Sequence, residues 1–308
     1  MIDTILAEEC AEERSEEVLW ILDVDLSRTS LAELPKLQNN YQFCTKLNLS
    51  GNNLKGSVTW LLNLKRLQWI DLSHNDLTEL SDVCASISNL LHLNVSHNNL
   101  SQLPEWIWFL EKIVELNLSY NPISRASQFH YKVAKWKKIQ VCNLENTNLV
   151  LVPESLKSAP ELRELYVGNG LSTSSFDHTF NNLWIFPEPL PPGLCSLDVS
   201  NVCLPNMETN WKSLHQLRQF RASTNNISWF PYDLLSLDKL EECDLSSNQL
   251  LVLPTDFGMM HNLRYINFSY NRLVVIPKSF ERLTNLRHLD LYSNLIESFQ
   301  CDIGNLSR

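Results

Sequence analysis

The sequence predicts a single elongated α/β solenoid, in which short parallel β-strands form one face of a stack of similar coils. One short apolar pattern recurs twelve times in 308 residues, each copy with a polar position three residues after its second apolar anchor. This position, called here the Asn slot, is held by Thr29, Asn52, Asn75, Asn98, Asn121, Thr147, Gly170, Val202, Asn225, Asn248, Asn271 and Asn294. Nine of the eleven steps are 23 residues, and the other two are 26 and 32. A unit this short cannot bury its apolar edge alone, so successive units must stack.

Each unit is expected to begin with a short strand. In LNLSGNNL, Leu47 and Leu49 alternate with Asn48 and Ser50, so the two leucines point inward and the polar residues outward. The slot residue follows the strand at a turn. An amide carries both donors and acceptors, which explains why Asn is preferred there.

These copies resemble the leucine-rich repeat family over residues 20–308. The resemblance rests on LNLSGNNL, IDLSHNDL, LNVSHNNL, LNLSYNPI, CDLSSNQL, INFSYNRL and LDLYSNLI. Endings with Leu-Pro, Val-Pro or Ile-Pro at Pro35, Pro104, Pro153, Pro254 and Pro277 are similar to the 23-residue class of intracellular signalling scaffolds. The resemblance implies a horseshoe with a parallel β-sheet on the concave face and short helices, 3-10 turns or loops on the convex face. It also implies that the slot Asn bonds backbone groups of adjacent coils, which Gly170 and Val202 cannot do.

Three segments depart from the repeat. Residues 1–19 are predicted to form a helix that caps the first coil, with Ile5, Leu6, Ala11, Val18 and Leu19 on its apolar side. Residues 130–138 predict a short Lys-rich convex helix, for which a solvated face is the ordinary interpretation and an acidic partner or lipid the alternative. Residues 171–192 form a Ser/Thr-rich and then Pro-rich insertion, which we expect to pack in part and rank as a secondary binding site.

The chain ends within an ordinary repeat at Arg308. We therefore expect either an open end or further repeats, with or without an effector domain, in a longer protein. Its first residues are acidic and lack a secretion signal, and no apolar run approaches the ~20 residues of a membrane helix. The eight cysteines are spread widely and show no metal-ligand spacing. These features predict a cytoplasmic protein with no cofactor and no metal.

The outward strand positions are the candidate binding surface, because period-two alternation turns them toward solvent. Exposed rings beside carboxylates resemble the hot spots of protein interfaces. One cluster of such residues falls in the units from 69 to 97, and a second in those from 265 to 292. The predicted protein-binding residues are Trp69, Asp71, His74, His92, Asn94, His97, Asn117, Tyr120, Tyr166, Arg221, Asp244, Tyr265, Asn267, Tyr270, His288, Asp290 and Tyr292.

The net charge and the absence of known catalytic motifs limit the functions that the sequence supports. The net charge of −10 and the outward Asp residues favour a partner with a basic or Arg-bearing surface and disfavour nucleic acid. No catalytic constellation is present: the chain has no P-loop, nucleophile elbow, zinc-protease or kinase motif. We therefore expect a non-catalytic scaffold or adaptor that binds protein partners on its concave face in intracellular signalling. The alternative is the recognition half of a larger signalling enzyme, such as a kinase, GTPase, phosphatase or ubiquitin ligase.

Overall fold

The computed structural model describes most of the chain between Asp23 and Cys301. The described residues are 23–33, 43–56, 58–81, 87–123, 135–150, 152, 156, 159–170, 180–183, 190–204, 207 and 211–301. The predicted cap helix at 1–19 and most of the 171–192 insertion lie outside these ranges.

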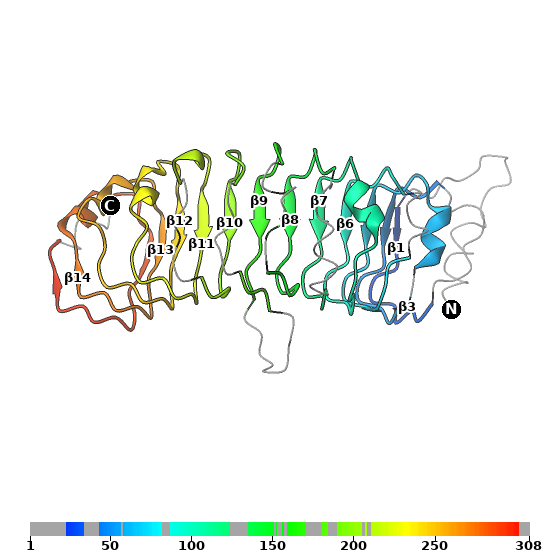
Figure 1. Cartoon of the computed structure of the whole chain (residues 1–308), viewed down its shortest axis with the longest axis horizontal. Helices are drawn as coiled ribbons and strands as arrows, with labels where there is room; N and C mark the ends of the chain where they lie inside the picture. Colours follow the sequence, from blue (N-terminus) through cyan, green and yellow to red (C-terminus); the bar gives the residue numbers. More distant parts are fainter. Residues whose placement is uncertain are drawn as a thin grey trace, which may run out of the picture.

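The described residues form a gently curved row of coils with one strand in each (Figure 1). Twelve strands pair in parallel in chain order, which confirms the predicted horseshoe architecture and its parallel sheet. They are β1 (Asp23–Asp25), β2 (Lys46–Asn48), β4 (Trp69–Asp71), β6 (His92–Asn94), β7 (Glu115–Asn117), β8 (Val141–Asn143), β9 (Glu164–Tyr166), β10 (Ser196–Asp198), β11 (Gln219–Arg221), β12 (Glu242–Asp244), β13 (Tyr265–Asn267) and β15 (His288–Asp290).

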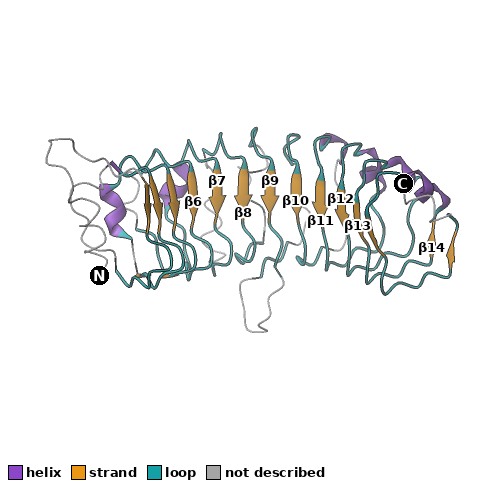
Figure 2. Ribbon diagram, turned by 180° about the vertical axis from the view of Figure 1, so that it is seen from behind, coloured by secondary structure: helices purple, strands orange, loops and turns teal. Residues whose placement is uncertain are grey.

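The opposite side of the coils carries short 3-10 helices, seen in Figure 2 toward the two ends of the row. They are η2 (Thr59–Asn63), η4 (Glu105–Phe109), η6 (Trp211–Ser213), η7 (Tyr232–Ser236), η8 (Phe257–Met259) and η9 (Lys278–Arg282). Three of them follow a proline, Pro104, Pro231 or Pro277, whose ring fixes φ near −65° to −70° just before the turn. Two small parallel sheets join neighbouring coils elsewhere: β3 (Lys55–Gly56) pairs with β5 (Asp76–Leu77), and β14 (Val275–Ile276) pairs with β16 (Ser298–Phe299).

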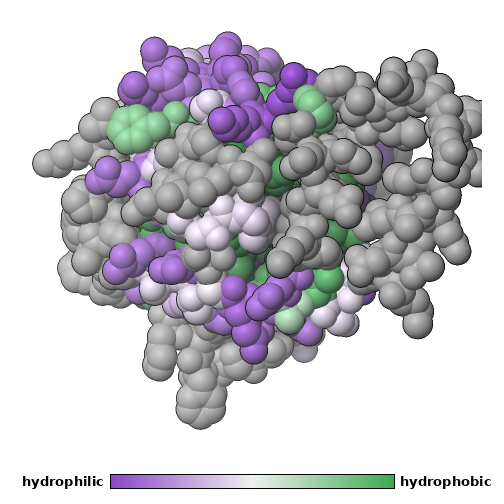
Figure 3. All heavy atoms as spheres, turned by 90° about the vertical axis from the view of Figure 1, so that its right-hand side faces the viewer, coloured by the Kyte–Doolittle hydropathy of each residue, from purple (hydrophilic) through white to green (hydrophobic). Residues whose placement is uncertain are grey.

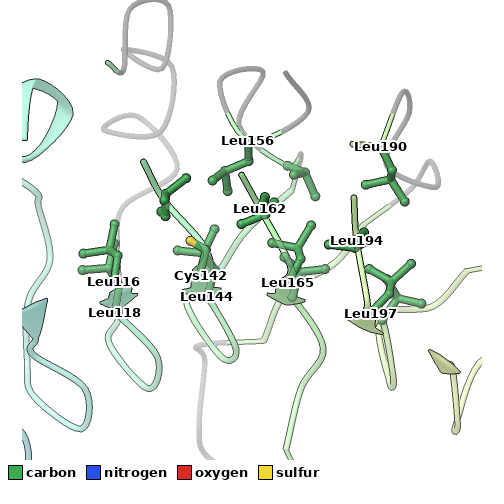
Figure 4. Packing of buried hydrophobic residues seen from close by; sticks show 14 of the residues in the cluster. Leu116, Leu118, Cys142, Leu144, Leu156, Leu162, Leu165, Leu190, Leu194 and Leu197 are labelled. Atoms are coloured by element: carbon green, nitrogen blue, oxygen red, sulfur yellow. The ribbon is translucent and has the colours of Figure 1, made fainter. Parts of the chain in front are cut away.

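A continuous apolar core runs along the inside of the coils. In the twelve-stranded sheet the middle residue of every strand from β1 to β13 is buried, and the same leucine positions stack from coil to coil (Figure 4). Cys142 and Cys243 take this strand position in their units and are fully buried. Seen end-on from the first coil, apolar residues show between the hydrophilic residues at the upper and lower margins (Figure 3). Removal of this surface from water is the main stabilising contribution of the fold.

Buried amides tie each coil to the one before it. Nδ2 of Asn75 donates to the carbonyl oxygen of Leu49 in the preceding coil (2.9 Å) and to that of Leu72 in its own coil (3.0 Å), while its Oδ1 accepts from the N–H of Leu54 (3.0 Å). This pattern of bonds repeats at Asn52, Asn98, Asn121, Asn225, Asn248, Asn271 and Asn294. The slot Asn therefore satisfies backbone groups that would otherwise be buried without partners.

Asn181 takes this role in the irregular unit, where sequence spacing places Gly170. Its Nδ2 donates to the carbonyl oxygens of Leu144 (2.7 Å) and Val167 (2.9 Å), and its Oδ1 accepts from the N–H of Thr147 (3.0 Å). The slot residues of this unit and the next are thus 181 and 202. The 32-residue step between 170 and 202 therefore consists of 11 residues before Asn181 and a shortened step of 21 after it.

The long step between 121 and 147 is anchored by tryptophan. Nε1–H of Trp136 donates to the carbonyl oxygen of Ile107 (2.9 Å), and the Trp136 ring packs against Trp108 at 5.2 Å between centroids. Most of the predicted Lys-rich helix falls on residues 124–134, outside the described ranges, and the described residues from 135 to 138 are not helical. The lysines at 135 and 138 pair with Glu111 (3.1 Å) and Glu161 (2.6 Å) of neighbouring coils.

Candidate protein-binding surface

The outward residues of the strands form two straight columns across the sheet. Strand register aligns Trp69 with His92 and Asp71 with Asn94, and each further strand continues the same alignment. At the other end, Tyr265 aligns with His288. In the strands of this sheet from β2 to β13 the middle residue is fully buried, whereas the outward residues, apart from the buried Ser196, stay in contact with solvent. The predicted columns are therefore the solvent face of the sheet.

One of these columns is a ladder of side-chain turns. Where the third residue of a strand is Asp or Asn, its Oδ1 atom accepts a hydrogen bond from the main-chain N–H two residues later, as Oδ1 of Asp71 does from the N–H of Ser73 at 2.8 Å. The same turn forms at Asp25, Asn48, Asn94, Asn117, Asn143, Asp198, Asp244, Asn267 and Asp290. Tyr166 and Arg221 are the two third strand residues that cannot form it.

Neighbouring members of this column also bond sideways. Nδ2 of Asn94 donates to Oδ2 of Asp71 at 3.0 Å, and Nδ2 of Asn48 donates to Oδ2 of Asp25 at 3.2 Å. The hydrogen bond from the Ser27 backbone lowers the pKa of Asp25 because it stabilises the ionised carboxylate. The Asp residues are thus held in one geometry, so a partner would meet a preformed row of charge rather than mobile carboxylates.

Three rings stack along the turns that follow β4, β6 and β7. The His74 and His97 rings lie 4.1 Å apart with an interplanar angle of 11°, and the His97 and Tyr120 rings lie 4.2 Å apart at 9°. Each of the three residues has a φ of 53° or 54°, which is the left-handed backbone conformation. Burial lowers the pKa of His97, and the neighbouring His74 adds to this effect.

The Tyr120 hydroxyl reaches past the next coil to Gly170. A Cβ atom at Gly170 would overlap the Tyr120 hydroxyl oxygen, so a larger residue at this position would require the Tyr120 side chain to shift. The N–H of Gly170 donates to Oδ1 of Asn146 at 2.8 Å. The stack therefore ends against the first residue of the irregular segment.

A second group of rings lies at the far end of the sheet. Tyr265 and His288 stack at 4.6 Å with an interplanar angle of 5°, and Tyr270 and Tyr292 meet edge to face at 5.4 Å and 75°. Tyr270 and Tyr292 are both exposed. Such pairs present a broad, rigid surface of rings with polar ends, which suits contact with another protein.

The candidates near the start of the sheet separate into two rows. Trp69 and His92 begin their strands, where Nζ of Lys46 lies 4.9 Å from the centre of a Trp69 ring and Nδ1 of His92 lies 3.0 Å from Oε2 of Glu115. His74 and His97 belong instead to the turn row of stacked rings. The structure thus places these residues on one face but along its two margins.

The middle of the sheet carries a partly buried polar group. Tyr166 donates to Oε2 of Glu164 at 2.7 Å, and burial together with this bond raises the pKa of Tyr166 to about 12. Burial also raises the pKa of Asp198 and of Glu145. Arg221 lies 3.2 Å from Glu242 and is the basic member of this group.

Sequence reasoning missed several residues of this face and of the flank beside it. Asn181 was hidden by the insertion, although Asn181 and Leu183 repeat the N-x-L spacing of the slot. Glu145 follows β8 and Glu164 begins β9, so both lie outside the column formed by the third residue of each strand. The apolar residues Trp229 and Val252 belong to no sequence motif. They could have been noticed only because polar residues occupy the equivalent positions of earlier coils.

Within the described ranges no group of three or more His, Cys, Asp or Glu residues is arranged to hold a metal ion. No helix among those residues has the length and apolarity to cross a bilayer.

Comparison with known proteins agrees with the repeat architecture. A profile of the leucine-rich repeat family matches residues 75–123 and 236–296. No curated protein sequence matches the chain.

Three solved structures illustrate the likeness. An internalin (InlF) of Listeria monocytogenes aligns over 95% of this chain and 86% of its own, with 18% identity and a TM-score of 0.70. A TDR receptor aligns over 91% of this chain with 25% identity and a TM-score of 0.71, but this chain spans only 48% of it. The ectodomain of the Arabidopsis thaliana receptor kinase GASSHO1/SCHENGEN3, solved in complex with CASPARIAN STRIP INTEGRITY FACTOR 2, aligns over 87% of this chain and 35% of its own, with 23% identity and a TM-score of 0.59.

Proposed function

The chain is a leucine-rich repeat protein, and on that premise we propose that it is a non-catalytic scaffold that holds a protein partner against the solvent face of its twelve-stranded sheet. Proteins of this fold are in general interaction scaffolds. The observation that carries the proposal is the preformed row of outward Asp and Asn side chains, with stacked rings along its margin. Charge and aromatic surface at fixed positions give a partner both register and contact area.

The proposed partner surface is basic or Arg-bearing. The outward column contains Asp25, Asp71, Asp198, Asp244 and Asp290, while Arg221 is its basic member and is already paired with Glu242. Twelve strands at roughly 4.8 Å make a surface about 50 Å long, which suits a folded protein or an extended peptide rather than a metabolite. A cytoplasmic site of action in signal transduction is part of the same proposal.

Site-specific photocrosslinking tests this function. A photoreactive phenylalanine analogue is introduced at Tyr292 or His74 on the sheet face, and the matched control carries it at Met259 on the 3-10 helix η8. We expect one protein to crosslink from both sheet-face positions and not from Met259. Crosslinks that arise only from Met259 would contradict the proposal.

The role of the Asp column is tested by a change that keeps its geometry. Asp71→Asn together with Asp244→Asn removes two charges but keeps the acceptor for the Ser73 and Ser246 N–H groups, as Asn94 does in its own unit. We expect the association rate of the crosslinked partner to fall and to depend less on salt. Unchanged kinetics in the double variant would exclude the Asp column as the steering surface.

A further inference from the structure

Three neighbouring coils near the end of the chain expose apolar side chains on one flank of the solenoid, in the segment of each coil that follows the strand and the slot residue. Four of them lie three or four residues after the slot residues Asn225, Asn248 and Asn271, and the fifth, Tyr232, lies seven residues after Asn225. We name as the flank patch, with their exposed fractions, Trp229 (54%), Tyr232 (62%), Leu251 (50%), Val252 (57%) and Val274 (37%).

The same positions are polar in earlier coils. They hold Lys55 in one unit, Thr78 and Glu79 in the next, and Ser101 and Gln102 in the one after. All of these are exposed. The repeat therefore does not require apolar residues at these positions, and in the flank patch they remain uncovered.

The patch is continuous from coil to coil. The N–H of Val274 donates to the carbonyl oxygen of Leu251 at 3.3 Å, and the N–H of Gln249 donates to that of Ile227 at 2.8 Å. The Tyr232 hydroxyl donates to Oδ2 of Asp256 in the following coil at 3.2 Å. Neighbouring side chains on this flank thus lie about one strand spacing apart.

The backbone of the flank already bonds between coils, which limits how a partner can attach. The carbonyl oxygens of Leu251 and Val274 both accept hydrogen bonds from the following coil. A partner cannot add a strand to this surface as it would to an open sheet edge. Its contacts must be made by side chains.

The dimensions favour a helix over a second copy of this chain. Two half-exposed rings and three aliphatic side chains present on the order of 500 Å², a typical size for a functional surface patch. A stable dimer buries about 800 Å² on each partner, which is more than the patch offers. Two coil steps of about 4.8 Å cover roughly 10 Å, which matches the rise of a helix from residue i to i+7.

Carboxylates border one edge of the patch. Asp256 is bonded to Tyr232, and Asp233 is the next residue along η7; both are exposed. In the third coil Lys278 occupies the position that corresponds to Tyr232, so the acidic edge covers the first two coils. A helix with basic residues beside its apolar stripe would place them against this edge.

From the flank patch we propose a second docking site, which takes a basic amphipathic helix of a protein partner. The apolar residues of the helix at i, i+3 or i+4, and i+7 lie across the three coils, and its basic flank faces Asp233 and Asp256. This site is separate from the sheet face, so it stands or fails independently of the proposed function.

The test uses a fluorescein-labelled peptide of Leu and Lys, about 14 residues or roughly 20 Å of helix, with one apolar stripe. Fluorescence anisotropy with the full chain is expected to show saturable binding. Leu251→Thr with Val252→Glu installs the pair that the chain itself carries at Thr78 and Glu79, so the coil is expected to fold. This double variant should weaken binding at least about tenfold, in keeping with the loss of two apolar contacts.

A control variant brackets the result. Ser101→Thr on an early coil should leave peptide binding unchanged. Circular dichroism shows whether the double variant is folded, and Trp229→Gln provides a second test in the neighbouring coil. Equal affinity of the peptide for the folded variants and the unaltered chain would overturn the proposal.

A peptide with Glu in place of Lys tests the acidic edge. It should bind more weakly than the Lys peptide, and equal binding of the two peptides would contradict the proposed basic helix.

Two other occupants would give distinct results, and either result would overturn the proposal. Vesicles of phosphatidylcholine that bind through the patch, while the peptide does not, would assign it to a membrane. Sedimentation that shows a dimer lost in the Leu251→Thr, Val252→Glu variant would assign it to a second copy.

Discussion

Asn169 and Asn181 hydrogen-bond to each other in both directions. The main-chain N–H of Asn181 donates to Oδ1 of Asn169 at 2.7 Å, and Nδ2 of Asn169 donates to the carbonyl oxygen of Asn181 at 2.8 Å. This pair holds together two points of the chain on either side of residues 170–180. The pair positions Asn181 at the Asn slot, where its side chain hydrogen-bonds to the preceding coil. The row of buried slot amides therefore continues past the irregular segment.

Replacement of Asn181 by Ala should destabilise this part of the solenoid. The change removes the hydrogen bonds that Asn181 makes to the buried carbonyl oxygen of Val167 and to the buried N–H of Leu149, for which the side chain of Ala offers no replacement. We expect a loss of about 3 kcal/mol in the free energy of unfolding. Hydrogen exchange should accelerate at Thr147 and Leu149 and remain slow in β13. Asn182→Ala is the neighbouring control, and equal exchange in both variants would show that the Asn181 side chain is dispensable.

Replacement of Tyr120 by Asn should raise the pKa of His97. Burial lowers this pKa, and the Tyr120 ring 4.2 Å away covers one face of the imidazole. Asn tolerates the left-handed backbone at this position, so the turn is expected to persist. NMR titration of the His97 ring measures the change, with Tyr270→Asn as the control. A titration of His97 that is identical in both variants would mean that Tyr120 does not shield it.

The pH dependence of stability should change when Asp198 becomes Asn. Burial raises the pKa of Asp198, so the folded state holds its proton more firmly than the unfolded state. Its contribution to stability is therefore present at low pH and is lost as the pH rises through the raised pKa. Asn keeps the acceptor for the Ser200 N–H and has no charge to bury.

The Asp198→Asn variant should therefore melt at a higher temperature than the unaltered chain at pH 7. The gain should vanish in acid, below the ordinary Asp pKa of about 3.9. Calorimetry at pH 7 and near pH 3 measures this, with Asp71→Asn in the same column as the control. A lower melting temperature for Asp198→Asn at pH 7 would contradict the interpretation.

The cysteines should react with iodoacetamide in a fixed order. Burial raises the pKa of Cys44 to about 11 and raises those of Cys142 and Cys243 further, so their thiolates are scarce and inaccessible. Cys203 is exposed. Peptide mass spectrometry should show alkylation of Cys203 in the native protein, and alkylation of Cys142 and Cys243 only in denaturant. Native labelling of Cys243 would show that its coil opens readily.

Much of the fold could be predicted because each coil repeats the same pattern of inward apolar and outward polar residues. Leu47 and Leu49 in one unit and Cys243 and Leu245 in another meet the same requirement for two inward anchors, so the strands and their register follow from spacing. The outward columns follow as well. Within the candidate site, the period alone therefore predicts which residues occupy the outward positions of the strands.

The state of those residues was not predictable in the same way. Asp71 supplies a turn acceptor to Ser73 and a side-chain acceptor to Asn94, and these partners depend on distances set by stacked coils. A signal was present, since an Asp or Asn two residues before a Ser favours this turn. The stacking of His74 on His97 likewise joins residues 23 positions apart, which only the packing of coils brings to 4.1 Å.

By itself the sequence determined the period, the inward and outward faces and the identity of most slot residues, because these follow from local alternation repeated at a constant length. Tertiary structure alone decided that Asn181 fills the slot left by Gly170, that rings pair along the margins of the sheet, and that Trp229, Leu251 and Val274 form one surface. These features depend on which coils lie side by side and at what distance. Such contacts arise only when the chain has folded and neighbouring units share a core.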